Sequence, residues 1–251
     1  MKKEFFSFCV LADPHCAETA WWKPEVYGNH IDRFFACVAE MDKLKGDNRP
    51  DFMLIIGDVH LWELEKHLSR TSMPMHVISG NHEGTPDRKK QMRELFPDDF
   101  KRNGKESDYY SFVHKGVRFI GLCDAPTSDH IGSLCSEYIN PRGQCEWLEK
   151  ELAQKETKKI IFAHIPPQPE SKDQNSYLAR NDSRWFLELV KKAQPLAMFF
   201  GHSHKSTIEY KFGKTRSFTV RSCAWNFSEV PLGFLMVKIL PKGMEIEEII
   251  I

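Results

Sequence analysis

Short apolar segments recur along the chain and alternate with segments whose apolar residues have helical spacing. Runs of about four to eight apolar residues are typical of buried strands, whereas an apolar stripe every three to four residues is typical of amphipathic helices. The pattern predicts strands at 5–12, 52–56, 75–79, 160–163 and 196–200, and helices within 30–45, 87–96, 144–156 and 182–193.

Two regions have a different, β-rich pattern. Residues 108–123 predict a β-hairpin that turns at Lys115 and Gly116, and Pro141 and Asp182 are the predicted starts of the two later helices. Beyond residue 204, strands are predicted at 206–212, 215–220, 233–240 and 244–250, the last as an edge or closing strand. No internal repeat, low-complexity tract or Pro/Ser-rich linker interrupts this pattern, which predicts one domain, residues 1–251, with mixed sheets covered by helices.

The composition, 41% hydrophobic and 28% charged, is typical of a soluble globular protein. Lys and Arg together number 35, and Asp and Glu together also number 35, so the formal net charge is zero. No net positive charge therefore favours nucleic acid or an anionic membrane as a partner. No stretch is long enough to span a bilayer. Glu4 interrupts the apolar start, so we expect this segment to be a first strand rather than a signal peptide.

The cysteines indicate a reducing compartment. Their number is odd and none forms a CxxC pair, which argues against a disulfide scaffold and favours a cytoplasmic location. Several lie in apolar runs, where a free thiol behaves as a small hydrophobic group. The seven are Cys9, Cys16, Cys37, Cys123, Cys135, Cys145 and Cys223.

Polar side chains follow five of the predicted strands at the point where each strand ends. In open α/β sheets, ligands bind beyond the carboxyl ends of the strands, so we expect these side chains to meet. A pair such as His202 and His204, one residue apart in extended backbone, faces one space. The converging residues are Asp13, His15, Asp58, Asn81, His164, His202 and His204, with His82 beside them.

Carboxylate oxygens, imidazole nitrogens and an amide oxygen form a donor set that suits Mn, Fe or Zn. The absence of thiolates argues against a structural zinc site. Seven donors are too many for one ion with an open position, but they fit two ions that share a bridging carboxylate. Two ions about 3.5–4 Å apart are the arrangement used for in-line displacement at phosphorus. Gly57, Gly80 and Gly201 would let the backbone approach closely at these strand ends.

The ordered motifs DxH, GD, GNHE, H and GHxH, from Asp13 to His204, resemble the calcineurin-like metallophosphoesterase superfamily. The resemblance implies a metallo-dependent phosphatase fold, a four-layer αββα sandwich with two central mixed β-sheets flanked by helices. It also implies Asp13, His15, Asp58 and His204 on a first metal, with Asp58 bridging to a second metal held by Asn81, His164 and His202. In this pattern His82 is the catalytic residue, lying over the phosphate to stabilise charge or to protonate the leaving oxygen.

The resemblance implies a dimetal phosphohydrolase that acts on a small phosphate ester. Coordination to zinc can lower the pKa of water from 15.7 to about 7, so a hydroxide shared by two ions would attack phosphorus at neutral pH. The chain length, the 108–123 hairpin and the segment after it are most similar to the class III cyclic nucleotide phosphodiesterase branch. We therefore expect a phosphodiesterase, with cyclic nucleotides as candidate substrates. The alternatives are a phosphomonoesterase or nucleotide pyrophosphatase of the same superfamily and a non-catalytic scaffold with the same fold.

Other residues near the motifs have more than one interpretation. His60 would contact substrate, cap the following helix or face solvent, and "GDVHLWE" lacks the DRG of serine/threonine protein phosphatases. Trp21 and Trp22 would line a base-binding slot or pack a loop onto the body. Three arginines are candidates to hold a phosphate: Arg142, Arg180 and Arg221.

Overall fold

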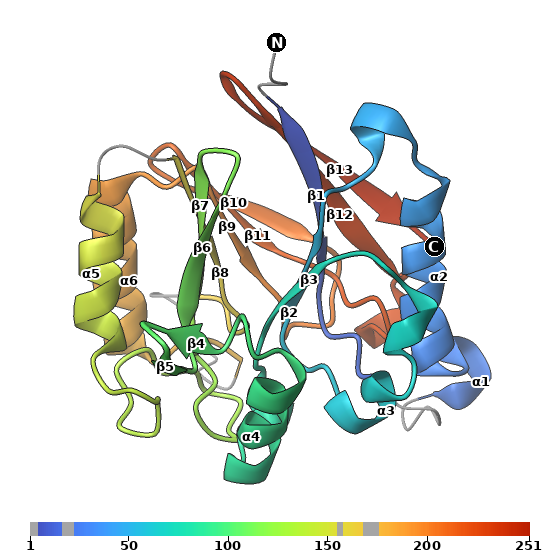
Figure 1. Cartoon of the computed structure of the whole chain (residues 1–251), viewed down its shortest axis with the longest axis horizontal. Coiled ribbons are helices and arrows are strands. Elements are labelled where there is room, and N and C mark those ends of the chain that lie inside the picture. Colours follow the sequence, from blue (N-terminus) through green and yellow to red (C-terminus); the bar gives the residue numbers. More distant parts are fainter. Residues whose placement is uncertain (1–4, 17–22, 155–157, 168–175) are drawn as a thin grey trace.

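Two β-sheets pack face to face in the computed structural model, which describes residues 5–16, 23–154, 158–167 and 176–251 (Figure 1). The five-stranded sheet has the order β13-β12-β1-β2-β3 and the six-stranded sheet the order β10-β11-β9-β8-β7-β6. The strands of the first are β1 Phe6–Leu11, β2 Met53–Ile56, β3 Met75–Ile78, β12 Gly233–Leu240 and β13 Gly243–Ile250. Those of the second are β6 Tyr110–His114, β7 Val117–Gly121, β8 Lys158–Phe162, β9 Ala197–Phe200, β10 Ile208–Phe212 and β11 Thr215–Thr219; β4 Lys101–Arg102 and β5 Lys105–Glu106 form a small hairpin.

Both sheets are mixed. In the first, β1, β2 and β3 are parallel, and β12 and β13 are antiparallel additions at one side. In the second, β7, β8, β9 and β11 are parallel, with β6 and β10 as antiparallel edge strands. The parallel strands are almost wholly buried, which explains why they appear in the sequence as continuous apolar runs rather than alternating ones.

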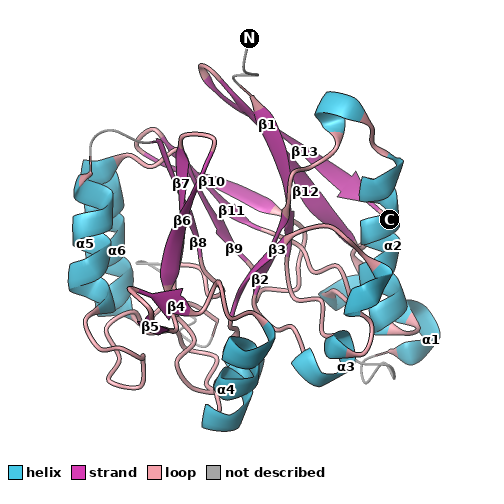
Figure 2. Ribbon diagram, viewed as in Figure 1, coloured by secondary structure: helices cyan, strands magenta, loops and turns pink. Residues whose placement is uncertain are grey.

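Helices cover the outer face of each sheet (Figure 2). They are α1 Pro24–Tyr27, α2 His30–Lys43, α3 Leu61–Glu65, α4 Pro86–Leu95, α5 Gln144–Ala153 and α6 Arg180–Ala193, with 3-10 turns η1 Gly46–Asn48, η2 Leu68–Arg70, η3 Asn81–Glu83 and η4 Phe227–Glu229. The α2 helix begins where the Asn29 side chain accepts hydrogen bonds from the backbone N–H groups of Ile31 and Asp32.

Three apolar layers separate these four layers of secondary structure. Aromatic rings such as Phe8, Phe52 and Phe119 fill the space between the sheets. A second layer joins α2, α3 and α4 to the five-stranded sheet, and a third joins α5 and α6 to the six-stranded sheet. The αββα architecture implied by the sequence motifs is therefore confirmed.

The predicted strands are all present, within two residues at each end, and the hairpin turns at Lys115 and Gly116, which both have positive φ. The predicted starts of the two later helices were wrong. α5 begins three residues after Pro141, where the buried Gln144 side chain bonds the backbone of Cys123. α6 begins two residues before Asp182, whose carboxylate accepts hydrogen bonds from Ser133 and Leu134 and so anchors a loop.

The cysteine interpretation was wrong for one pair. Cys135 and Cys145 form a disulfide with a Cα–Cα distance of 5.8 Å, which ties the loop before α5 to the first turn of that helix. The other five cysteines are buried free thiols, as expected. A cytoplasmic location stays a prediction. Among the described helices, none is long and apolar enough to cross a membrane.

Candidate metal centre

The seven predicted ligands lie together where the carboxyl ends of strands from both sheets meet. Asp13 and His15 follow β1, Asp58 follows β2 and Asn81 follows β3, all in the five-stranded sheet. The remaining three come from the six-stranded sheet. They are His164, after β8, and His202 and His204, after β9.

The first group of donors is Asp13, His15, Asp58 and His204, which are all buried and offer ligand atoms within 4.8 Å of one another. The Nε2 atoms of His15 and His204 are 3.2 Å apart. His15 Nε2 lies 3.7 Å from Asp58 Oδ2, and His204 Nε2 lies 3.5 Å from Asp13 Oδ1. Two carboxylates and two imidazoles therefore converge on one space.

The second group is Asp58, His164 and His202, with Asn81 beside them. His164 Nε2 lies 3.3 Å from Asp58 Oδ2 and 3.2 Å from Asn81 Oδ1. It is also 3.2 Å from His202 Nδ1. Asp58 is common to both groups, and the same Oδ2 atom faces the imidazoles of both.

Hydrogen bonds to backbone carbonyls fix the orientation of two rings. His164 Nδ1 donates to the carbonyl oxygen of Ile56 at 2.9 Å, and His204 Nδ1 donates to that of Trp225 at 2.7 Å. Each Nε2 atom is thereby directed at the cluster. His164 Nε2 then faces two oxygen acceptors, an arrangement that a bound cation satisfies, so these residues fit metal ions.

Burial keeps most of these imidazoles neutral. It lowers the pKa of His202 to about 3 and that of His204 to about 4, and it lowers the pKa of His15 well below the ordinary value. Neutral imidazole is the form that binds a metal, so these three rings are in the ligating form at pH 7.

At Asp13, Asp58 and His164, burial competes with the charges of neighbouring groups in setting the pKa. Burial raises the pKa of Asp13 to about 8. It also raises the pKa of Asp58, but the imidazoles, His164 first, outweigh it and hold this pKa well below the ordinary value. Burial lowers the pKa of His164, but the carboxylates, Asp58 first, outweigh it and raise this pKa to about 10. A bound divalent cation would take the place of the proton on His164.

The backbone at the centre has an unusual conformation. Asp13, His15, Asp58, His202 and His204 all have positive φ, between 40° and 68°. Residues other than glycine adopt this region at an energetic cost, and such residues concentrate at functional sites. The cost of this conformation indicates that these turns serve the function of the site rather than the stability of the fold.

Two glycines allow the carboxylates to reach their positions. A Cβ at Gly80 would overlap the Asp58 side chain, and a Cβ at Gly201 would lie 2.6 Å from Asp13 Oδ2. Close approach of the backbone to these carboxylates therefore requires glycine, as the sequence predicted.

Two buried carboxylates that the sequence did not single out support the loops of the centre. Glu83 accepts hydrogen bonds from the backbone N–H groups of Gly80, Val59 and His60, and so joins the loops after β2 and β3. Asp124 accepts from the N–H groups of His164 and Ile165. The signal for Asp124 was its position directly after the "FIGLC" strand, the same placement that the predicted ligands share.

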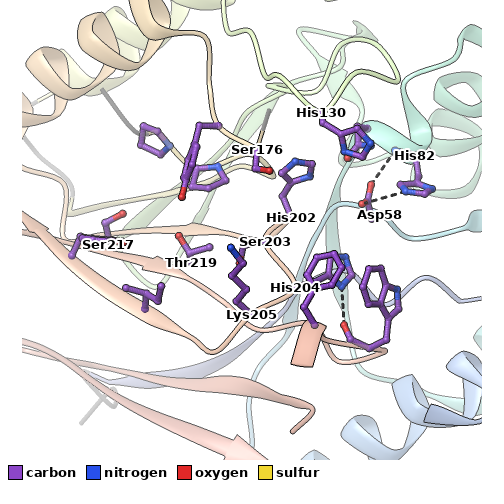
Figure 3. Close-up of a pocket in the computed structure, with 18 of the residues that line it drawn as sticks. Asp58, His82, His130, Ser176, His202, Ser203, His204, Lys205, Ser217 and Thr219 are labelled. Atoms are coloured by element: carbon purple, nitrogen blue, oxygen red, sulfur yellow. Dashed lines mark hydrogen bonds and ion pairs between the residues drawn. The ribbon is translucent and has the colours of Figure 1, made fainter. Parts of the chain in front are cut away.

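His82 lies at the surface of the centre, with its side chain 32% exposed and its Nε2 4.0 Å from Asp58 Oδ2 (Figure 3). Its backbone N–H donates to Asp58 Oδ1 at 3.0 Å, and Arg88 donates to its carbonyl oxygen. His60 does not cap α3 through its side chain. Instead, His60 Nε2 lies 3.2 Å from His82 Nδ1, so one ring positions the other.

We expect His60→Ala to lower kcat/KM by about 10- to 100-fold, by analogy with the residues that orient metal-binding imidazoles. Metal content should stay at the wild-type level, because His60 belongs to neither predicted ligand group. Elemental analysis and steady-state kinetics on the same preparation measure both quantities. His60→Gln should recover part of the activity, since an amide can still bond the His82 ring, and equal losses in the two variants would contradict a positioning role.

The remaining sequence candidates have other surroundings. Trp21 and Trp22 lie outside the described residues. Arg142 is exposed and paired with Glu137, and Arg221 is buried and paired with Glu248. Arg180 is exposed at the start of α6 and does not line the cavity at the metal centre.

Comparisons with known proteins agree with this geometry. A family model described as calcineurin-like phosphoesterase matches residues 6–206. Sphingomyelin phosphodiesterase 2 of Caenorhabditis elegans is 25% identical over 199 residues, which covers 61% of this chain but 31% of the relative. The chain therefore spans less than a third of the length of that relative.

Solved structures share the fold. A dimetal phosphatase from Danio rerio superposes with a TM-score of 0.66 at 16% identity, covering 98% of each chain. The anchor in the inner membrane complex of Plasmodium superposes with a TM-score of 0.61 at 13% identity, covering 98% of this chain and 84% of the other. Since the family model spans most of the sequence, the chain belongs to the calcineurin-like phosphoesterase family.

Proposed function

We propose that the protein is a two-metal phosphodiesterase. Asp13, His15, Asp58 and His204 would hold one ion, and Asn81, His164 and His202 would hold the other together with Asp58. The observation that carries this proposal is the shared Asp58 Oδ2, which lies 3.7 Å from His15 Nε2 and 3.3 Å from His164 Nε2. A carboxylate oxygen between two groups of imidazoles is suited to bridging two cations.

Two divalent ions in such a site supply a nucleophile at neutral pH and neutralise the oxygens of the phosphate. The remaining roles fall to side chains of the protein. We assign to His82, at the exposed side of the centre, the donation of a proton to the leaving oxygen. His60 and Arg88 hold its ring and its backbone, and Glu83 fixes the loop that carries it.

The donors narrow the choice of ions. The set combines carboxylate, imidazole and amide ligands and contains no thiolate, which favours Mn, Fe or Zn. Metal-stripped protein should be inactive, and the ion that restores turnover at the lowest concentration identifies the working metal.

A phosphodiester is the substrate class that we favour over a monoester. Support comes from the similarity to a sphingomyelin phosphodiesterase and from a cavity of about 550 Å³ at the centre, which is larger than a phosphate group requires. Cyclic nucleotides stay the candidate substrates that the resemblance to the class III phosphodiesterase branch favours.

Hydrolysis of bis-(p-nitrophenyl) phosphate and p-nitrophenyl phosphate by protein loaded with manganese tests the proposal. We expect turnover of both esters, with higher kcat/KM for the diester, and loss of both activities on chelation. A strong preference for the monoester would indicate a phosphomonoesterase. No turnover, together with no bound metal by elemental analysis, would favour the non-catalytic scaffold.

A further inference from the structure

The cavity at the metal centre continues over the outer face of the β10–β11 hairpin. The strand register places Ile208 opposite Thr219 and Tyr210 opposite Ser217, so these four side chains form one patch. Thr219 also pairs with Phe200, two residues before His202, so the patch begins at the edge of the centre. Figure 3 shows Ser217 and Thr219 at the opposite side of His202 and His204 from His82.

We propose that this patch, the hairpin subsite, binds a planar heteroaromatic ring with a polar edge, such as a nucleobase, on the substituent that stays attached to phosphorus. The inference rests on the proposed function and adds the residues that would recognise the retained substituent. His82 would face the leaving group, because it lies across the centre from the hairpin subsite.

One strand of the hairpin subsite provides an apolar wall. The side chains of Ile208 and Tyr210 are 40% and 43% exposed, and both border the cavity at the metal centre. An exposed aromatic ring next to a catalytic centre offers a flat surface on which another ring can stack. Stacking on an aromatic side chain is tolerant of the identity of the base.

The neighbouring strand provides two hydroxyl groups. Ser217 is 3% exposed and Thr219 is 7% exposed, and both line the cavity. Among the described residues, no hydrogen bond to either hydroxyl is found. Because both residues line the cavity, their hydroxyls are positioned to bond a ligand there, as donors or as acceptors.

The hydroxyls distinguish a polar-edged ring from an alkyl chain. A hydrocarbon chain in the hairpin subsite would cover both hydroxyls and offer them no partner, which weakens binding. The edge of a nucleobase carries donors and acceptors, and a hydroxyl can serve either. Lys205, which is exposed and has no ion pair with the described residues, borders the same cavity and would attract the phosphate charge.

Three diesters with the same leaving group test the inference: the p-nitrophenyl esters of methyl phosphate, octyl phosphate and thymidine 5′-phosphate. In metal-loaded protein we expect kcat/KM for the thymidine ester to exceed those for the methyl and octyl esters by about tenfold or more, the value of one well-placed hydrogen bond. Ser217→Ala and Thr219→Val should each reduce the ratio of thymidine ester to methyl ester by about tenfold. Lys211→Ala, on the other face of β10, is the matched control and should leave the ratio unchanged.

Binding of free thymidine to metal-free protein, measured by NMR, gives a readout that does not depend on turnover. We expect binding that Ser217→Ala weakens by about tenfold. Equal kcat/KM for all three esters would overturn the hairpin subsite while leaving the phosphodiesterase intact. Preference for the octyl ester, strengthened by Thr219→Val, would show that the patch binds lipid-like groups. If no ester is hydrolysed, the proposed function fails, and thymidine binding alone decides the hairpin subsite.

Discussion

Asp58→Asn is expected to remove both metal ions and to lower kcat/KM by at least about 10³-fold. This loss is larger than the loss typical of substitutions at residues that only orient a metal ligand. One oxygen of this carboxylate faces both groups of donors, and its partner oxygen accepts the His82 N–H. Asparagine has nearly the same shape but no charge, so the substitution removes the attraction for both cations without creating a cavity. Elemental analysis should show metal content falling from two equivalents to less than one.

Asp98→Asn is the matched control for this substitution, because Asp98 is exposed on the loop after α4 and loses the same charge. It should keep wild-type metal content and activity. Thermal melting of both variants shows whether the fold survives. An Asp58→Asn protein that binds two equivalents of metal and turns over normally would refute the bridging assignment.

His82→Ala is expected to keep both metals and to lose about 10²- to 10⁴-fold in turnover, the range of general acid catalysis. The loss should grow with the pKa of the leaving alcohol, because a poor leaving group depends most on protonation. Kinetics on a series of aryl and alkyl diesters measure this slope, and elemental analysis of the same samples reports the metal content.

His130→Ala provides the comparison, since His130 also borders the cavity and its ring centroid lies 5.6 Å from that of His202. We expect a smaller loss that does not depend on the leaving group. If His82→Ala slowed good and poor leaving groups equally, His82 would stabilise charge rather than donate a proton.

The fold was predictable from the sequence because local and global signals agree. Continuous apolar runs such as "MLII" and "AMFF" are buried on both faces of parallel strands, and the periodic helices cover them. The positions of the donors were also predictable, since each lies within four residues after the end of a strand. Helix starts were less predictable, because Asp182 is a good capping residue that instead bonds Ser133 and Leu134 from a distant loop.

Contacts between segments far apart in the sequence could not be predicted. The contact of His60 with His82 depends on how the loops after β2 and β3 approach each other, and Glu83 fixes that approach. The Cys135–Cys145 disulfide depends on a loop whose course follows no periodic pattern. The patch on the β10–β11 hairpin required the register, because the sequence does not show which residues of the two strands are opposite.

Each group of predicted ligands draws side chains from both β-sheets, and this has a thermodynamic consequence. Ions held there would act as cross-links between two halves of the molecule that otherwise adhere through aromatic packing. A ligand present at 100 times its dissociation constant stabilises the native state by about 2.7 kcal/mol. Metal supply would then govern how long the molecule persists against proteolysis, in addition to how fast it turns over substrate.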